Sequence, residues 1–304
     1  MIGAVELGLI YAVMALGVYL TFRILNFPDL TVDGSFTTGA ATAAVLITGG
    51  THPALATLVA GVAGLAAGVI TGLLHAKGGI NPLLAGILTQ IGLYSINLRI
   101  MDSPNVPLLR MDTLMTPLRE NGLLGKAAGI AIFAALALLV KVALDWFLHT
   151  DTGLALQATG DNEEMIRSFG VNTDRAKILG LALSNGLVGL CGAIIAQYQG
   201  FADISMGIGL IIAGLASVIL GQAVFGSRVI LISTLAVVLG SVLYRVAIQL
   251  ALRVGFLDAN DMKLISAVLV VIALLLPKWG VFRRIGALRS LRRTAATSAT
   301  TGGA

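Results

Sequence analysis

The chain has 304 residues, of which 57% are hydrophobic and only 12% are charged, and its mean hydropathy is +0.94. Soluble globular proteins carry about 25% charged residues, so this composition excludes that class and predicts a protein embedded in a lipid bilayer. The formal net charge is +5, but six of the twenty basic residues lie in the acid-free tail after the last apolar run, which indicates membrane topology rather than nucleic-acid binding.

Apolar runs long enough to cross a bilayer recur along the chain, since about 20 helical residues span a hydrocarbon core of about 30 Å. The sequence predicts an all-α polytopic membrane protein with about nine helices, in a range of about eight to ten. The predicted spans lie near 2–22, 34–48, 53–75, 82–101, 123–148, 174–199, 206–225, 228–252 and 260–277.

These spans form a single transmembrane domain over residues 1–277, with related halves at about 1–148 and 174–277. A polar loop, 149–173, joins the halves. The basic tail, 278–304, is expected to lie in the cytoplasm, because Lys and Arg are enriched on that side, and to be flexible at its end. Glycines spaced by four residues at Gly64, Gly68 and Gly72 predict that a neighbouring helix packs closely against the third span.

A short element occurs twice, each time before an apolar run. Phe27-Pro-Asp-Leu-Thr-Val-Asp-Gly34 recurs as Phe201-Ala-Asp-Ile-Ser-Met-Gly207, with one residue fewer. An odd number of predicted spans separates the copies, which would invert the second half relative to the first. Inverted repeats with discontinuous helices are typical of transporters. We therefore expect discontinuous second and seventh helices; a chance match of so short an element is the alternative.

The polar residues of these copies have two interpretations. Asp29 and Asp203 are each followed two residues later by a hydroxyl residue, and short oxygen side chains accept hydrogen bonds from the free N–H groups that begin a helix. Capping of a re-entrant helix is therefore one interpretation. Contact with a transported solute is the other, because charge inside a membrane protein is usually functional. The candidate pathway residues are Asp29, Thr31, Asp33, Ser35, Gln90, Asn97, Asp203 and Ser205.

The polar loop is expected to contain a two-turn helix. Asp161 can cap its start, Glu163 and Glu164 lie where the helix dipole favours negative charge, and Gly170 suits a left-handed end. Its apolar side consists of Met165, Ile166 and Phe169. This side suits a groove on a partner protein, and packing on the protein's own helices is the equal alternative.

The segment from Gly153 to Asp174 resembles the coupling-helix region of the permease family that serves branched-chain amino acid and ribose-type ABC importers. The glycine-rich opening, Gly8 to Gly17, and the stretch from Asn26 to Gly34 look like that family's first helix and the start of its second. The resemblance covers the chain up to the tail. The Pro-Asp-Leu-Thr-Val-Asp-Gly form departs from typical members, which look more like Asn-Phe-Ala-His-Gly-Asp. It is closer to a less characterised branch associated with aromatic amino acids such as tryptophan.

The resemblance implies a permease subunit of an ATP-driven importer in the bacterial inner membrane, which passes a small solute such as an amino acid. It implies a homodimer or related heterodimer of permeases, two cytoplasmic ATPase subunits and an external binding protein. This chain would not be an enzyme and would hold no cofactor, since ATP and Mg²⁺ would bind the ATPase. Carried over by position, the coupling helix comprises Asp161, Asn162, Glu163, Glu164, Met165, Ile166, Arg167, Ser168, Phe169 and Gly170.

Other classes are less favoured. The chain has no phosphate-binding loop, because Gly122-Leu-Leu-Gly-Lys-Ala lacks both the spacing and the hydroxyl residue. An ion-coupled secondary transporter or channel would use Asp29, Asp33 or Asp203 to bind a coupling ion. An intramembrane enzyme is disfavoured, because the predicted spans contain no Ser/His pair and no convergent carboxylates. The single Cys191 allows no disulfide within the chain, and no metal site is expected.

Overall fold

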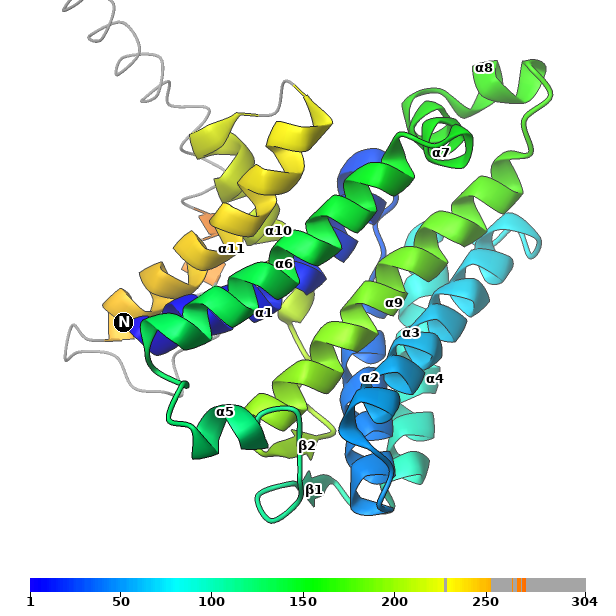
Figure 1. Ribbon diagram of the computed structural model, residues 1–304. Helices are drawn as coiled ribbons and strands as arrows, with labels where there is room; N and C mark the ends of the chain where they lie inside the picture. The colour runs from blue at the N-terminus through cyan, green and yellow to red at the C-terminus, as the bar shows by residue number, and fades with distance from the viewer. Residues whose placement is uncertain (227–228, 253–263, 265–266, 269, 272–304) are drawn as a thin grey trace, which may run out of the picture.

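The computed structural model describes residues 1–226, 229–252, 264, 267–268 and 270–271. This part of the chain forms a bundle of inclined helices and one small sheet (Figure 1). The long helices are α1 (Ile2–Tyr19), α2 (Thr31–Thr48), α3 (Pro53–Ala76), α4 (Pro82–Met101), α6 (Ala127–Leu148), α9 (Thr173–Gln199), α10 (Leu210–Phe225) and α11 (Ile230–Leu252). The shorter elements are the π-helix η1 (Leu20–Ile24), α5 (Thr116–Glu120), α7 (Asp151–Asp161), α8 (Glu163–Ser168), β1 (Asn105–Pro107) and β2 (Phe201–Asp203).

Six of the described helical segments are long and apolar enough to cross a membrane: α1 with η1, α3, α4, α6, α9 and α11. The predicted spans at 34–48 and 206–225 also fall on helices, α2 and the shorter apolar helix α10. The predicted span at 260–277 lies outside the described residues except for a few positions, and so does the tail at 278–304. The helical, polytopic architecture is confirmed, whereas the count of about nine spans stays a prediction.

The centre of the bundle is α9, which packs against α1, α2 and α3 and buries most of its length. The glycines of α3 make this packing close. A Cβ atom on Gly64 would collide with the carbonyl oxygen of Asn185, and one on Gly68 would collide with that of Leu181. The predicted close approach at the third span is therefore confirmed, and α9 is the helix that approaches.

The two ends of the bundle carry different elements. α7 and α8 lie together at one end, and α5 with the β1–β2 sheet lies at the other (Figure 1). The strands are antiparallel, with Asn105 opposite Asp203 and Pro107 opposite Phe201. The sheet thus ties the α4–α6 connection to the segment that leads into α10.

Both copies of the repeated element lie in connections before helices, whereas α2 from Thr31 to Thr48 and α10 from Leu210 to Phe225 are each continuous, so the predicted discontinuity within these helices is wrong. After η1 the chain is non-helical until α2 begins at Thr31, and after β2 it forms turns until α10 begins. Both copies contain the same local turn. Asp29 Oδ1 accepts a hydrogen bond from the Thr31 amide at 2.9 Å, and Asp203 Oδ1 accepts one from the Ser205 amide at 2.8 Å. The turn at Asp29 meets the first residue of α2, whereas Asp203 lies seven residues before α10 and does not cap it. The capping interpretation therefore holds for the first copy alone, while the inversion of the halves stays a prediction.

Candidate substrate passage and coupling helix

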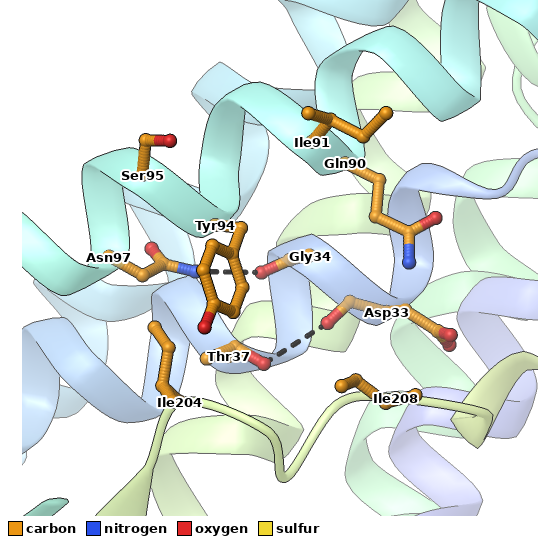
Figure 2. A pocket seen from close by; sticks show the side chains of 10 residues that line it. All are labelled: Asp33, Gly34, Thr37, Gln90, Ile91, Tyr94, Ser95, Asn97, Ile204 and Ile208. Carbon is orange, nitrogen blue, oxygen red and sulfur yellow. Dashed lines mark hydrogen bonds between the residues drawn. The ribbon is translucent and has the colours of Figure 1, made fainter. Parts of the chain in front are cut away.

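A cavity of ≈ 440 Å³ lies between α2, α4 and the turn segment that precedes α10 (Figure 2). Its lining combines polar groups with the apolar side chains of three isoleucines. The lining residues are Asp33, Gly34, Thr37, Gln90, Ile91, Tyr94, Ser95, Asn97, Ile204 and Ile208. Both copies of the repeated element contribute to this wall, since Asp33 and Gly34 belong to the first copy and Ile204 to the second.

Asp33 joins the two copies directly. Its Oδ2 accepts a hydrogen bond from the Gly209 amide at 2.7 Å, and its Oδ1 accepts one from the Ile211 amide at 2.8 Å. The carboxylate therefore occupies the N-terminus of α10, where free N–H groups and the helix dipole favour negative charge. Gly207 packs against the Asp33 carbonyl and the Thr37 hydroxyl so closely that a Cβ atom would not fit. The first turn of α2 and the turn before α10 form one packed unit.

α4 supplies the polar side of the cavity. Gln90, Tyr94 and Asn97 are spaced by four and three residues, which places them on one helix face. Their side chains extend from α4 toward α2 (Figure 2). Asn97 Nδ2 donates to the Gly34 carbonyl at 3.4 Å, and Asn97 Oδ1 is buried without a hydrogen-bond partner among the described residues. The cavity thus offers hydrogen-bonding groups beside apolar surface, a combination suited to a small amphipathic solute.

A buried polar network lies behind the cavity. Asp29 Oδ2 accepts from Asn185 Nδ2 at 2.7 Å, and Asn185 Oδ1 accepts from the Ser35 hydroxyl at 2.7 Å. The Thr31 hydroxyl is 2.7 Å from the hydroxyl of Thr71 in α3. Every member is buried, so these bonds satisfy groups that neither lipid nor water reaches. The network fixes the start of α2 against α3 and α9.

The structure brings only some of the candidate pathway residues together. Asp33, Gln90 and Asn97 line the cavity. Asp29, Thr31 and Ser35 lie in the network, and Asp203 and Ser205 form the outer turn next to Ile204. Whether any of the eight contacts a solute stays a prediction. The sequence interpretation missed Tyr94 and Ser95, although both carry polar groups and lie about one helical turn after Gln90 in the same predicted span.

A short helix, α8, lies where the two-turn helix was predicted, with one correction to its cap; its role in coupling stays a prediction. Its N-cap is Asn162, whose Oδ1 accepts from the Met165 amide at 3.0 Å. The prediction that Asp161 caps this helix is wrong, because α7 continues through Asp161 and leaves Asn162 at the junction. Gly170 has φ = +84°, as expected for the left-handed turn after a helix.

Two of the three apolar side chains of this segment, Met165 and Phe169, are exposed, and Ile166 is partly buried. None of its residues is buried, and Phe169 just beyond it is 75% exposed while Met165 is 47% exposed. Met165 and Phe169 therefore do not pack on the described part of the chain, whereas Ile166 is partly buried, and both interpretations of this apolar side stay predictions. Large apolar side chains exposed on a short polar helix are typical of a contact surface for another protein.

Glu163 attaches α8 to the bundle. Its Oε2 accepts from Lys177 Nζ at 2.6 Å, and its Oε1 accepts from the Thr173 hydroxyl and from Arg167 Nη2, each at 3.1 Å. The hydrogen bond and charge of Lys177 hold the pKa of the Glu163 carboxyl below its ordinary value, against the opposing effect of partial burial. α8 is thus held to the start of α9 mainly by charged hydrogen bonds.

The sequence interpretation missed α7. The Thr150 hydroxyl caps this helix by accepting from the Gly153 amide at 3.3 Å, and Leu156 is fully buried. Gly160 lies so close to the carbonyl of Ile24 that a Cβ atom would collide with it. α7 therefore rests on η1, the π-helical end of the first span, which leads directly to the interrupted segment before α2.

Comparisons with known proteins show the family of this chain. Residues 1–275 match the family described as "Branched-chain amino acid transport system / permease component". The chain is 43% identical over 264 residues to the tyrosine transport system permease protein of Clostridioides difficile (strain R20291), covering 87% of this chain and 86% of that protein. It is 35% identical over 278 residues to the uncharacterized protein RP368 of Rickettsia prowazekii (strain Madrid E), covering 90% and 96%.

A more distant relative is the autoinducer 2 import system permease protein LsrC of Yersinia pseudotuberculosis serotype O:1b (strain IP 31758). It is 28% identical over 216 residues, which cover 70% of this chain and 59% of that protein. No solved structure matches the chain. The family consists of transport components rather than enzymes. The chain therefore belongs to the branched-chain amino acid permease family and is a multi-pass membrane permease component of an ABC-type transport system.

Proposed function

We propose that this chain is the permease subunit of an ATP-driven ABC importer that passes an aromatic amino acid from an external binding protein into the cytoplasm. The observation that carries the proposal is membership of the permease family over residues 1–275. The 43% identity to a permease named for tyrosine transport supports the choice of solute. In this arrangement the bilayer is bacterial plasma membrane, and α7, α8 and the basic tail face the cytoplasm.

The cavity between the two repeat copies is the proposed passage. Its ≈ 440 Å³ is in the range of small-molecule sites, which are about 300–1,000 Å³. Tyr94 and the isoleucines offer apolar contact for a ring, while Gln90 and Asn97 offer hydrogen bonds for polar groups. The Asp33 carboxylate is hydrogen-bonded to α10, so its proposed role is to hold the passage wall rather than to bind solute alone.

α8 is the proposed coupling helix. The chain carries no phosphate-binding loop, so ATP and Mg²⁺ would bind a separate cytoplasmic ATPase subunit. The exposed side chains of Phe169 and Met165 suit an apolar groove on that subunit, and the carboxylates of the first turn suit its basic groups. Movement of the ATPase subunits during ATP hydrolysis would then be passed to the permease through α8.

The proposed assembly contains two copies of the permease. Among the described helices, α4 packs mainly against α2 and α3, and Tyr94 (49%) and Ser95 remain exposed beside the open cavity. Polar groups facing lipid are costly, so another protein surface is expected to cover them. A second copy, paired along α4, would close the cavity.

Reconstitution into liposomes separates this proposal from ion-coupled transport through Asp29, Asp33 or Asp203. The permease would be tested together with its ATPase and binding protein, and also alone under proton and sodium gradients. The proposal predicts tyrosine uptake that needs ATP, the ATPase and the binding protein together. Uptake by the permease alone under an ion gradient would contradict it.

A further inference from the structure

A line of side-chain contacts runs from α8 to the interrupted segment before α2, and His75 stands in its middle. His75 lies in the last turn of α3, at the same end of the bundle as α8. Its two ring nitrogens contact different elements: Nδ1 is 2.8 Å from the Ile80 carbonyl oxygen, and Nε2 is 3.4 Å from Lys177 Nζ. The same Lys177 holds Glu163 of α8.

These contacts define the directions of the hydrogen bonds at the imidazole. A carbonyl oxygen only accepts hydrogen bonds, so His75 Nδ1 donates to Ile80. An ammonium group only donates, so His75 Nε2 accepts from Lys177 Nζ. Lys177 therefore links Glu163 and His75 through hydrogen bonds of compatible direction.

The ring of His75 also meets the interrupted segment. Its centroid is 5.1 Å from that of Phe27, with the planes at 70°, an edge-to-face contact. Phe27 is 3% exposed and precedes Asp29 of the buried network by two residues. One turn earlier on α3, the hydroxyl of Thr71 is bonded to that of Thr31. The last two turns of α3 thus hold both sides of the Asp29 turn.

We propose that His75 is a positioning residue that transmits displacement of α8 to the segment 25–30 and so to the wall of the passage. The proposal rests on the proposed function, because it presumes that an ATPase moves α8. A shift of Glu163 moves Lys177, whose second bond is to His75, and the ring moves Phe27. The segment that receives the motion adjoins η1, and single π-helical turns frequently occur at functional sites.

The first test is the number of ATP molecules hydrolysed per tyrosine imported by the reconstituted complex. His75→Ala should raise this ratio about 2- to 30-fold, the range expected when a residue in a coupling network is removed. His149→Ala is the control: this exposed histidine also lies at a helix end, but its Nδ1 bonds the Asp145 carbonyl of its own helix. An unchanged ratio in His75→Ala would overturn the proposal.

A double-mutant cycle separates transmission from simple stabilisation. If Glu163 and His75 act along one line of contacts, Glu163→Gln should add little to the ratio already raised by His75→Ala. If each residue merely stabilises its own helix, the two effects should multiply, which would overturn the proposal. Size-exclusion elution of each variant with its ATPase checks that the complex is assembled.

A conformational readout completes the test. Pro28 is exposed and Cys191 is buried, so maleimide should label a Pro28→Cys variant selectively. The labelling rate should change on ATP binding, and His75→Ala should abolish that change. A rate that never responds to ATP, or one that responds equally without His75, would contradict transmission. Absence of ATP-driven uptake by the wild-type complex would instead contradict the proposed function itself.

Discussion

The Asp33 carboxylate of α2 accepts a hydrogen bond from the Gly209 amide at the start of α10, although the two residues are 176 positions apart. The second oxygen accepts from Ile211 at 2.8 Å. One side chain from the first repeat copy therefore caps the helix that follows the second copy. Because this pair also borders the cavity, capping and passage formation are combined in one residue.

Asp33→Asn should weaken this junction. An amide has a single acceptor oxygen, so one of the two N–H groups at α10 would lose its partner, at a cost of about 1–3 kcal/mol. The thermal midpoint of the purified permease should fall and uptake should fall with it. Asp112→Asn, at an exposed acid in the α4–α6 connection, is the control and should change neither. An unaltered midpoint in Asp33→Asn would show that the cap is dispensable.

The close packing of α3 on α9 gives a second prediction. Gly68→Ala places a Cβ atom against the Leu181 carbonyl, so the helices must separate, and overpacking of this kind costs about 1–3 kcal/mol. Gly92→Ala on α4 is the matched control because nothing lies within 4 Å of its added Cβ atom. Melting of the two variants should differ clearly, with Gly68→Ala the lower. Equal melting would contradict the tight helix contact.

The attachment of α8 should depend on pH in a defined direction. The pKa of Glu163 is lowered from 4.5, chiefly by the hydrogen bond from Lys177. The contribution of Glu163 to the attachment of α8 is therefore complete above pH 4.5 and is lost as the pH falls through the lowered pKa of the folded state. Hydrogen exchange of residues 162–172 should therefore be unchanged between pH 7 and pH 5 after correction for intrinsic rates. Glu163→Gln should raise exchange already at pH 7, whereas Glu164→Gln should not. Equal protection in both variants would contradict the role of Glu163.

Pairing of two permeases along α4 can be tested by disulfide cross-linking in membranes. Ser95→Cys should form a cross-linked dimer on mild oxidation, since a disulfide needs Cα atoms within about 7 Å. Leu139→Cys on α6 is equally accessible, with Leu139 67% exposed, and should remain monomeric. Cross-linking at Leu139 instead of Ser95 would place the second copy on another face.

Apolar runs were sufficient to predict the membrane class and most helix positions. The local turns before α2 and α10 were also predictable, because Asp-x-Thr and Asp-x-Ser form the same turn in both copies. The partners of these residues were not. Asp33 meets α10 and Asp29 meets Asn185 only after distant segments pack, and no spacing in the sequence encodes those contacts.

The errors around the loop have a similar cause. α7 is short and of mixed polarity, and its place depends on Gly160 fitting against Ile24. Because α7 extends through Asp161, the N-cap of α8 is Asn162 rather than the predicted Asp161. The contact of His75 with Phe27 could not be predicted from the sequence, because a histidine at the end of a helix can have many structural roles. Its contacts with Lys177 and Phe27 are seen only in the folded structure.

The most direct measurement of the central claim is ATP hydrolysis and tyrosine uptake, recorded together for the reconstituted wild type, Phe169→Leu and Phe169→Asp. Phe169 is 75% exposed, so both variants should fold. The account predicts that Phe169→Leu retains most uptake, whereas Phe169→Asp loses it by about 10-fold or more, a cost of about 1.4 kcal/mol or greater in coupling to the ATPase. Uptake by Phe169→Asp at the wild-type rate, driven by ATP, would contradict α8 as the coupling helix.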